Sequence, residues 1–578
     1  MAVAAAAVLA AGCGRSEPAP PQPAPAATSA AAQPAAPAAL PLPAVPLASL
    51  PKIDGAAILQ TTKVMSADKF QGRAPGTVGE ELTVAYLETQ FKDIGLAPGN
   101  PDGTYIQKVP LVGITGSETK PLTFVKGSQT LPLKWKDEVV AWSKHVAAGA
   151  SIADSDVVFV GYGVDAPEFN WNDFKDTDVK GKTIVVLVND PPVPDPANAA
   201  ALDPKTFGGK AMTYYGRWTY KFEQGARKGA AAILIVHETA PAGYPFPVVQ
   251  GNLNEKFDLV APDKNMGKAN IEGWITLDAA KRLFALAGQD YDALKKQALT
   301  REFKPVPLGV KASMAIANKL RTIDSRNVIA KLEGSDPLLK DEYIVYSSHW
   351  DHLGVGAPVN GDKIYNGALD NATGVATVLE IAKALKRTQP QPKRSFLFLM
   401  VTAEEKGLIG SEYYSLNPLY PLAKTVANIN IDGVNQWGRT KDISVVGLGA
   451  SELDDYLLQA AQEQGRTITP DAEPEKGFYY RSDHFNFAKQ GVPALDPDSG
   501  IDYVGKSAEW GKAKRDEYTE KDYHAPSDQV KPDWDLAGAV DDAHLLLAVG
   551  YRVANADRMP EWRAGNEFKA KRDAMLKK

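Results

Sequence analysis

The stretch Tyr343–Gly354, YIVYSSHWDHLG, decides the fold class of this 578-residue chain. Its first five residues are β-branched, aromatic or small, and they predict a short buried strand. His349 and Asp351 follow this strand directly. The stretch therefore predicts a strand whose carboxyl end presents an imidazole and a carboxylate.

The same pattern is repeated along the second half of the chain. Ser395–Thr402 (SFLFLMVT) and Val426–Ile431 (VANINI) predict two more strands. Between the first two strands lies Asp370–Arg387 (DNATGVATVLEIAKALKR), whose apolar residues share one face of a helix. Alternating strands and helices of this kind indicate an α/β fold with a doubly wound, mostly parallel sheet.

Acidic and imidazole side chains follow every predicted strand of this half. In doubly wound sheets, ligands bind at the carboxyl ends of the strands. Each residue alone has an ordinary explanation, such as a helix cap or a satisfied polar group. Together, carboxylates that converge on one edge repel one another unless a cation lies between them. The residues concerned are His349, Asp370, Glu404, Glu405 and Asp432.

This set of imidazole and carboxylate groups, with no thiolate, suits Zn²⁺ or a similar metal ion. It has too many members for one tetrahedral ion, but it suits two ions that share a bridging carboxylate. A second histidine is then needed from the rest of the chain. Two candidates are His484, in RSDHFNF, and His524, in DYHAPSDQ.

Six motifs in the chain resemble, in order and spacing, the M28 family of co-catalytic zinc aminopeptidases. The resemblance covers 321–554, with 53–109 as the N-terminal part of the sheet. It implies the zinc-dependent exopeptidase fold and two Zn²⁺ ions per chain. The motifs are SHWDHLG, DNATG, AEEKGLIGS, NIDGVN, RSDHFNF and YHAPSD.

The resemblance also implies how the metal ligands divide between the two ions. Asp370 would bridge them. His349 and Asp432 would complete one site, and Glu405 and His524 would complete the other.

Five further residues receive roles from the same resemblance. Glu404 would be the general base, and Asp351 would orient a metal-binding imidazole. Tyr523 would stabilise the oxyanion, and Arg481 would contact substrate. His484 would be structural or would support a metal ligand.

The segment at about 150–300 interrupts the catalytic pattern. It contains short β-rich runs, Asp156–Gly163 and Lys182–Val188, and then Phe222–Val236, which predicts a helix leading into a buried strand. This segment resembles the protease-associated (PA) domain, a β-rich module inserted in several peptidases. Such a module brings no chemistry of its own.

The N-terminal segment reads as a secretion signal followed by a tether. Met1–Gly14 contains a small-apolar run directly before Cys13, the single cysteine, and resembles a bacterial lipobox. Pro18–Pro51 has no charged residue and is rich in Pro and Ala, which favours an extended linker. We expect a lipoprotein of the bacterial cell envelope, periplasmic or at the outer membrane, or otherwise a secreted protein. A lipid on Cys13 would be its one contact with a membrane.

These readings divide the chain into six parts, and the last of them reads as a solvated tail. The parts are 1–13, signal and lipobox; 14–51, linker; 52–138, N-terminal part of the peptidase domain; 139–312, PA-like insertion; 313–557, catalytic part; and 558–578, charged tail.

The expected function is hydrolysis of N-terminal residues from peptides. A formal net charge of -6 gives no field that would favour nucleic acid, and one cysteine excludes an internal disulfide. A carboxypeptidase, a dipeptidase and a glutaminyl-cyclase-like transferase on the same scaffold remain alternatives. A non-catalytic receptor is a further one. The sequence does not indicate an oligomeric state.

Overall fold

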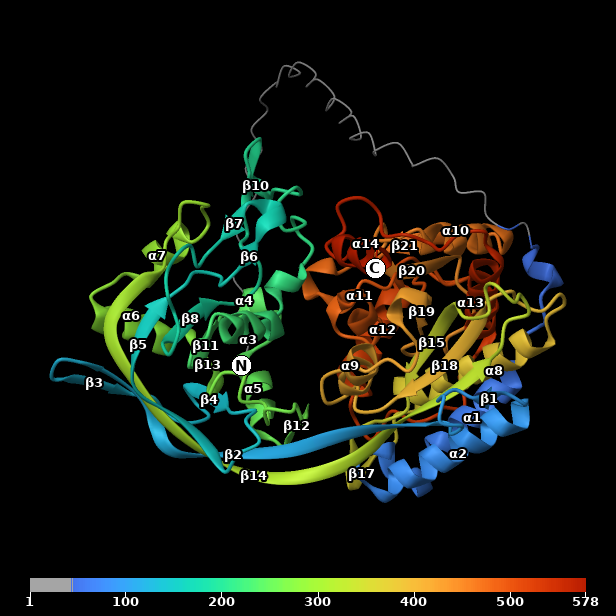
Figure 1. Ribbon diagram of the computed structural model, residues 1–578, viewed down its shortest axis with the longest axis horizontal. Coiled ribbons are helices and arrows are strands. Elements are labelled where there is room, and N and C mark those ends of the chain that lie inside the picture. Colours follow the sequence, from blue (N-terminus) through green and yellow to red (C-terminus); the bar gives the residue numbers. More distant parts are fainter. Residues whose placement is uncertain (1–42, 44, 578) are drawn as a thin grey trace, which may run out of the picture. The chain divides into compact units, whose positions relative to one another are not determined.

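One mixed sheet of 16 strands runs through the computed structural model, which describes residues 43 and 45–577 (Figure 1). The main path of the sheet has the order β21-β20-β22-β19-β15-β18-β14-β5-β8-β11-β13-β4. The predicted signal, Cys13 and most of the predicted linker lie outside the described residues. Among the residues that are described, no helix has both the length and the apolar character needed to cross a bilayer.

The catalytic half of the sheet is built on β15 (Tyr343–His349). It pairs in parallel with β18 (Ser395–Val401) on one side and β19 (Thr425–Asn430) on the other. β22 (Ala494–Ser499) continues in parallel beyond β19, and antiparallel neighbours follow only further out. The predicted α/β fold is confirmed, and the sheet is mainly parallel in this half although it is mixed as a whole.

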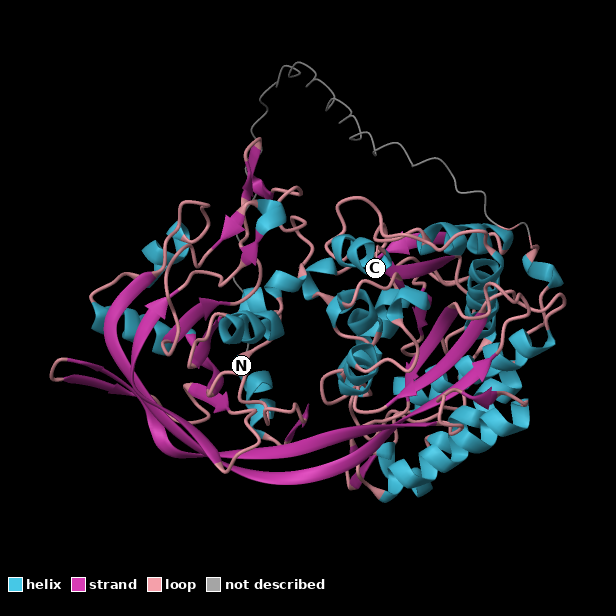
Figure 2. Ribbon diagram, viewed as in Figure 1, coloured by secondary structure: helices cyan, strands magenta, loops and turns pink. Residues whose placement is uncertain are grey.

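Helices cover both faces of this half because the side chains of its strands alternate (Figure 2). Tyr346 and Phe398 belong to the larger apolar core, with residues of α1 (Gly55–Met65), α2 (Val78–Ile94), α8 (Gly374–Arg387) and α13 (Ala537–Asn555). Val345 and Leu399 point the other way, into a core with α9 (Ile409–Leu416) and α11 (His484–Lys489). This double burial explains why the strands are apolar throughout.

Two long strands join this half to the rest of the sheet. β2 (Ile106–Lys126) and β14 (Val306–Leu332) form an antiparallel pair along most of their lengths. β14 pairs with β18 near its end and with β5 (Gly149–Phe159) near its start. The predicted boundary at 312/313 therefore falls inside a continuous strand. Beyond β5 lie β8 (Thr183–Leu187), β11 (Ala232–His237), β13 (Ile271–Thr276) and β4 (Val139–Trp142).

The remaining elements are shorter or lie at the periphery. The strands are β1 (Ala97–Pro98), β3 (Gln129–Pro132), β6 (Asp165–Ala166), β7 (Trp171–Asn172), β9 (Pro194–Asp195), β10 (Asn198–Leu202), β12 (Lys256–Leu259), β16 (Gly354–Val359), β17 (Asp362–Tyr365), β20 (Asp442–Val446) and β21 (Thr467–Pro470). The helices are α3 (Trp218–Arg227), α4 (Thr239–Ala242), α5 (Phe246–Gln250), α6 (Leu277–Ala287), α7 (Tyr291–Gln297), α10 (Leu453–Glu463), α12 (Trp510–Lys521) and α14 (Lys569–Leu576).

The charged tail at 558–578 is not solvated throughout, contrary to the prediction. Trp562 is buried, and the buried guanidinium of Arg572 donates hydrogen bonds to the backbone oxygens of Leu422 and Thr425. The tail therefore packs against the first residue of β19 and the turn that precedes it. Charge alone predicted exposure, but an arginine can be buried when backbone carbonyls accept its hydrogen bonds.

The end of the predicted linker is also packed. Leu47 and Leu50 are buried in the larger apolar core, and Arg552 donates hydrogen bonds to the backbone oxygen of Val45. The extended tether predicted for 14–51 is thus wrong for its last residues.

Candidate metal centre

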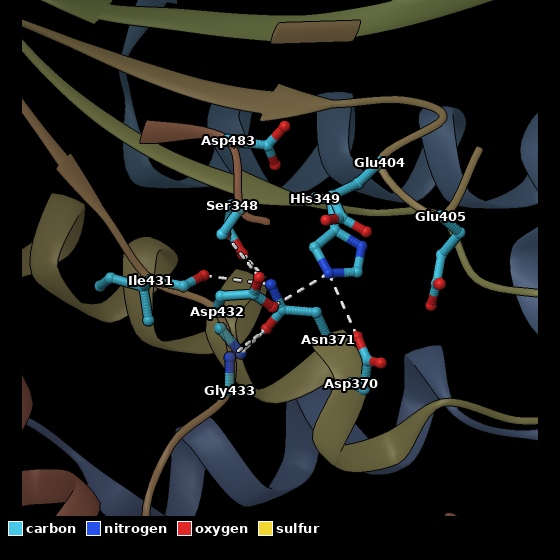
Figure 3. A network of polar contacts seen from close by, with 12 residues as sticks. Ser348, His349, Asp370, Asn371, Glu404, Glu405, Ile431, Asp432, Gly433 and Asp483 are labelled. Atoms are coloured by element: carbon cyan, nitrogen blue, oxygen red, sulfur yellow. Dashed lines mark hydrogen bonds and ion pairs between the residues drawn. The ribbon is translucent and has the colours of Figure 1, made fainter. Parts of the chain in front are cut away.

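The predicted ligands come together at the carboxyl ends of three parallel strands. His349 is the last residue of β15, Glu404 and Glu405 follow β18, and Asp432 follows β19. Asp370 lies in the turn that leads into α8. Figure 3 shows Asp370 and Asp432 both facing the imidazole of His349.

The first group of ligands centres on His349. Its Nε2 lies 3.1 Å from Asp432 Oδ1 and 3.2 Å from Asp370 Oδ1. Ser482 donates a hydrogen bond to the other oxygen of Asp432, with 2.6 Å between Ser482 Oγ and Asp432 Oδ2. The serine thus fixes which oxygen of Asp432 faces the imidazole.

The second group centres on His524. Its Nε2 lies 3.0 Å from Glu405 Oε2 and 3.2 Å from Asp370 Oδ2. The two oxygens of Asp370 therefore face two different histidines. This is the arrangement that a carboxylate bridging two ions requires.

These spacings fit zinc. Tetrahedral Zn²⁺ has bonds of about 2.0–2.1 Å to nitrogen and oxygen, which places its ligand atoms roughly 3.3 Å apart. The four nitrogen–oxygen distances in the two groups are 3.0–3.2 Å. The donor set, imidazole and carboxylate without thiolate, suits the same ion.

The electrostatics of the site also favour a cation. Burial alone would lower the pKa of His524, but hydrogen bonds to Asp370 and Glu405 raise it to about 10. In the metal-free protein the carboxylates therefore hold a proton on this imidazole. A metal ion that replaces the proton would satisfy the same carboxylates.

The backbone around the bridging residue is held by Asp528, which the sequence analysis did not select. Asp528 Oδ1 accepts a hydrogen bond from the N–H of Leu369 at 3.0 Å, and Oδ2 accepts one from the N–H of Asp370 at 3.1 Å. On the other side, Asn371 Oδ1 accepts a hydrogen bond from the N–H of Gly433 at 2.9 Å. The peptide bond between Asp370 and Asn371 is cis.

Arg73 is a second residue that the sequence analysis did not select. Its guanidinium is completely buried and donates hydrogen bonds to the backbone oxygens of Met65, Trp350, Asn366 and Gly367. Burial lowers the pKa of Arg73 to about 10. The arginine holds the residue that follows β15 and the two residues shortly before Asp370, so it supports the backbone on which two of the ligands stand.

Glu404 has the environment expected of a general base. Burial raises its pKa well above the usual range, and the charges of Asp432 and Glu405 add to this effect, while His349 opposes it. Its backbone N–H donates a hydrogen bond to Asp351 Oδ1 at 3.0 Å. A carboxylate with a raised pKa accepts a proton more readily.

Asp351 lies beneath His349, but its carboxylate is not the nearest group. His349 Nδ1 lies 3.1 Å from the backbone oxygen of Asp351 and 3.8 Å from its Oδ1. A proton on Nδ1 would be donated to that carbonyl, which leaves Nε2 free for a metal ion. The group nearest to Nδ1 is therefore the backbone oxygen of Asp351, whereas the resemblance implied its carboxylate. Burial raises the pKa of the Asp351 carboxyl to about 7.

Tyr523 and Arg481 differ in how close they lie to the ligands. The half-exposed ring of Tyr523 stacks on the ring of His524, with 3.9 Å between centroids. The Arg481 guanidinium lies over the ring of Phe478, 5.3 Å from its centroid. Its connection to the site is through the next residue in the chain, Ser482, which contacts Asp432.

His484 does not join the metal ligands. It is buried, with Nδ1 3.4 Å from Asp496 Oδ2 and its ring edge-on to that of Tyr479. The His484 ring therefore lies beside Asp496 and Tyr479, and its role stays a prediction.

His352 is a third imidazole near the ligands, and no role was predicted for it from the sequence. It lies in the same motif as His349 and Asp351, and its Nδ1 is 2.6 Å from Glu405 Oε1. Together with Asp370 and Glu405 it forms one of two groups of side chains that could hold a metal ion among the described residues. Its position in WDHLG, directly after Asp351, was the available signal.

Comparison with known proteins agrees with this geometry. Residues 327–548 match the sequence family Peptidase family M28. The chain is 30% identical over 208 residues to leupeptin-inactivating enzyme 1 of Streptomyces exfoliatus, covering 35% of this chain and 43% of that protein. It is 29% identical over 235 residues to leucine aminopeptidase 2 of Arthroderma otae, covering 38% and 43%. It is 33% identical over 129 residues to a glutamate carboxypeptidase 2 homolog of Caenorhabditis elegans, covering 22% and 15%.

The matched part contains the core of the site. The chain spans less than half the length of each of these relatives. All five metal ligands proposed from the sequence lie within 327–548, as do Glu404 and Tyr523. The part of the chain that matches Peptidase family M28 is therefore the part that carries the proposed metal ligands.

Proposed function

We propose that this protein is a two-zinc aminopeptidase that removes N-terminal residues from peptides. The observation that carries the proposal is the position of Asp370, whose two oxygens face His349 and His524 separately. Asp432 and Glu405 give each histidine a second carboxylate. Two similar half-sites that share one carboxylate support a co-catalytic metal pair.

The roles of the chain's own residues follow from their positions. When bound, a zinc pair supplies Lewis acidity and lowers the pKa of the attacking water toward neutrality. Glu404, with its raised pKa, would accept a proton from the attacking water and pass it to the leaving amine. The hydroxyl of Tyr523 would donate a hydrogen bond to the oxyanion from its place beside His524.

The alternatives differ in what they require of the site. A non-catalytic receptor has no need for a complete ligand set or for Glu404, and all these residues are present here. A glutaminyl-cyclase-like transferase makes less use of the second half-site. Carboxypeptidase and dipeptidase activities would use the same metal pair, and the relatives include a leucine aminopeptidase and a glutamate carboxypeptidase homolog by name.

Two further parts of the proposal concern regions outside the metal centre. The segment at 139–312 would be a PA-like insertion. The N-terminal signal would deliver the protein to the bacterial cell envelope as a lipoprotein attached through Cys13. Both rest on the sequence patterns described above.

The test combines a metal count with a peptide-library digest read by mass spectrometry. We expect two zinc ions per chain and the loss of single residues from the amino end of peptides. Blocking the amino terminus by acetylation should abolish cleavage. Release of residues from the carboxyl end would favour a carboxypeptidase, and two bound ions without any hydrolysis would favour the receptor.

A further inference from the structure

His352 is buried together with one of the proposed metal ligands. The side chains of His352 and Glu405 are 0% and 3% exposed, and 2.6 Å separates His352 Nδ1 from Glu405 Oε1. The two atoms lie at ion-pair distance without the alignment of a regular hydrogen bond. Glu405 Oε1 is buried and has no hydrogen-bond partner among the described residues, so His352 is the polar group that lies against it.

The distance between His352 and Glu405 argues against His352 being a zinc ligand itself. Ligand atoms on one tetrahedral zinc ion lie roughly 3.3 Å apart, as argued above. The contact between His352 and Glu405 is much shorter than this, at 2.6 Å. The other oxygen of Glu405 already has an imidazole at a ligand-like distance, because His524 Nε2 lies 3.0 Å from Oε2. The two oxygens of Glu405 thus have different partners.

The ring of His352 is held in place by the backbone beside it. A Cβ atom added to Gly367 would lie 2.5 Å from His352 Cγ, so the ring packs directly on this glycine. Gly367 has a φ of 55°, in the left-handed region that glycine favours. Its backbone oxygen accepts a hydrogen bond from Arg73. The imidazole therefore packs against a backbone segment that Arg73 holds by a hydrogen bond.

We propose that His352 is a positioning residue for the second zinc ion. It holds Oε1 of Glu405, so that Oε2 is directed at the metal position shared with His524 and Asp370. Removing it would leave a buried carboxylate oxygen without a partner and free the side chain to turn. This inference rests on the two-zinc function proposed above.

The test uses two amide variants that differ in where they place an N–H group. The amide nitrogen of asparagine stands near the position of Nδ1, whereas that of glutamine stands near Nε2. We expect His352→Gln to weaken the binding of one of the two zinc ions by roughly 10- to 100-fold. His352→Asn should stay within a few-fold of the wild type, and the affinity for the other ion should not change.

Zinc affinity would be measured on the full chain by competition with a chelator of known affinity, and the cobalt-substituted protein would give an absorption spectrum for each site. His237→Gln is the matched control, because His237 is a buried histidine on β11, outside the metal centre. His352→Leu gives a second loss variant, and circular dichroism reports the folding of the wild type and all four variants.

Three outcomes would overturn the inference. Wild-type affinity for both ions in His352→Gln and His352→Leu would show that the contact does not position Glu405. Equal loss in the Asn and Gln variants would make His352 a direct ligand. A wild-type protein that binds fewer than two ions would overturn the two-zinc proposal, and this inference with it. The first two outcomes leave the proposed function intact.

Discussion

The carboxylate of Asp528 accepts a hydrogen bond from the backbone N–H of Asp370, with 3.1 Å between Oδ2 and the nitrogen. Its other oxygen accepts one from the N–H of Leu369 at 3.0 Å. Asp528 lies four residues after His524 in the sequence. The segment that supplies the second histidine therefore also holds the backbone of the bridging carboxylate.

Asp528→Asn is expected to weaken this support without removing the side chain. An amide has one acceptor oxygen, so one of the two backbone N–H groups would face an NH₂ group and lose its partner. An unpaired buried donor costs about 1–3 kcal/mol. We expect zinc affinity to fall roughly 10- to 100-fold, as measured by chelator competition. Asp533→Asn, at an exposed aspartate, should change nothing. Unchanged affinity in Asp528→Asn would contradict the role given to Asp528.

Glu404→Gln and Glu405→Gln should separate the proposed base from the proposed ligand, although the two residues are adjacent. Glutamine at 404 cannot accept the proton, so kcat should fall by roughly 10²–10⁴-fold while zinc content stays at two ions. Glutamine at 405 should instead lower the zinc content. Atomic emission spectrometry and steady-state kinetics on an aminoacyl-nitroanilide would measure both. Near-normal turnover in Glu404→Gln would remove it from the mechanism.

The sequence predicted the parts of the site that follow from strand order. His349 ends β15, Glu405 and Asp432 follow β18 and β19, and the parallel sheet brings these strand ends together. The residues that support the ligands were not predictable in this way. Arg73 lies 277 positions from Trp350, whose oxygen it binds, and Asp528 lies 158 positions from Asp370.

Such contacts depend on how distant segments pack. The local sequence around a charged residue looks the same whether its side chain lies at the surface or in the core. Arg73 and Arg572 both carry a charge, yet both are buried, because backbone carbonyls accept their hydrogen bonds. His352 is different, because it stands in a motif with two assigned residues. Its role depends on which oxygen of Glu405 it faces, and only the structure shows that.

Tyr523→Phe is expected to lower kcat by roughly 10²–10³-fold, by analogy with the removal of one oxyanion donor. The ring of Tyr523 stacks on His524, and phenylalanine would keep this contact. Zinc content and KM should therefore stay near the wild-type values, which separates a loss of transition-state stabilisation from damage to the site. The measurement is steady-state kinetics with a matched metal count. An unchanged kcat would show that the hydroxyl takes no part.

His484 should make the stability of the protein depend on pH in a way that does not involve the metal ligands. Burial lowers the pKa of this imidazole from 6.5 to about 3. At a pH between these two pKa values, His484 binds a proton in the unfolded chain but not in the folded protein. The free energy of unfolding therefore falls as the pH falls below 6.5, and the contribution of His484 is fully present above that pH.

His484→Asn should remove this dependence. From pH 7 to pH 5, urea denaturation of the wild type should show a loss of stability about 2 kcal/mol larger than that of the variant. Both proteins would be measured with chelator present, so that protonation of the metal ligands affects them equally. The variant should start from a lower stability at pH 7, because asparagine fills less of the buried space beside Tyr479. Parallel pH profiles for the two proteins would show that the imidazole is not held neutral in the fold.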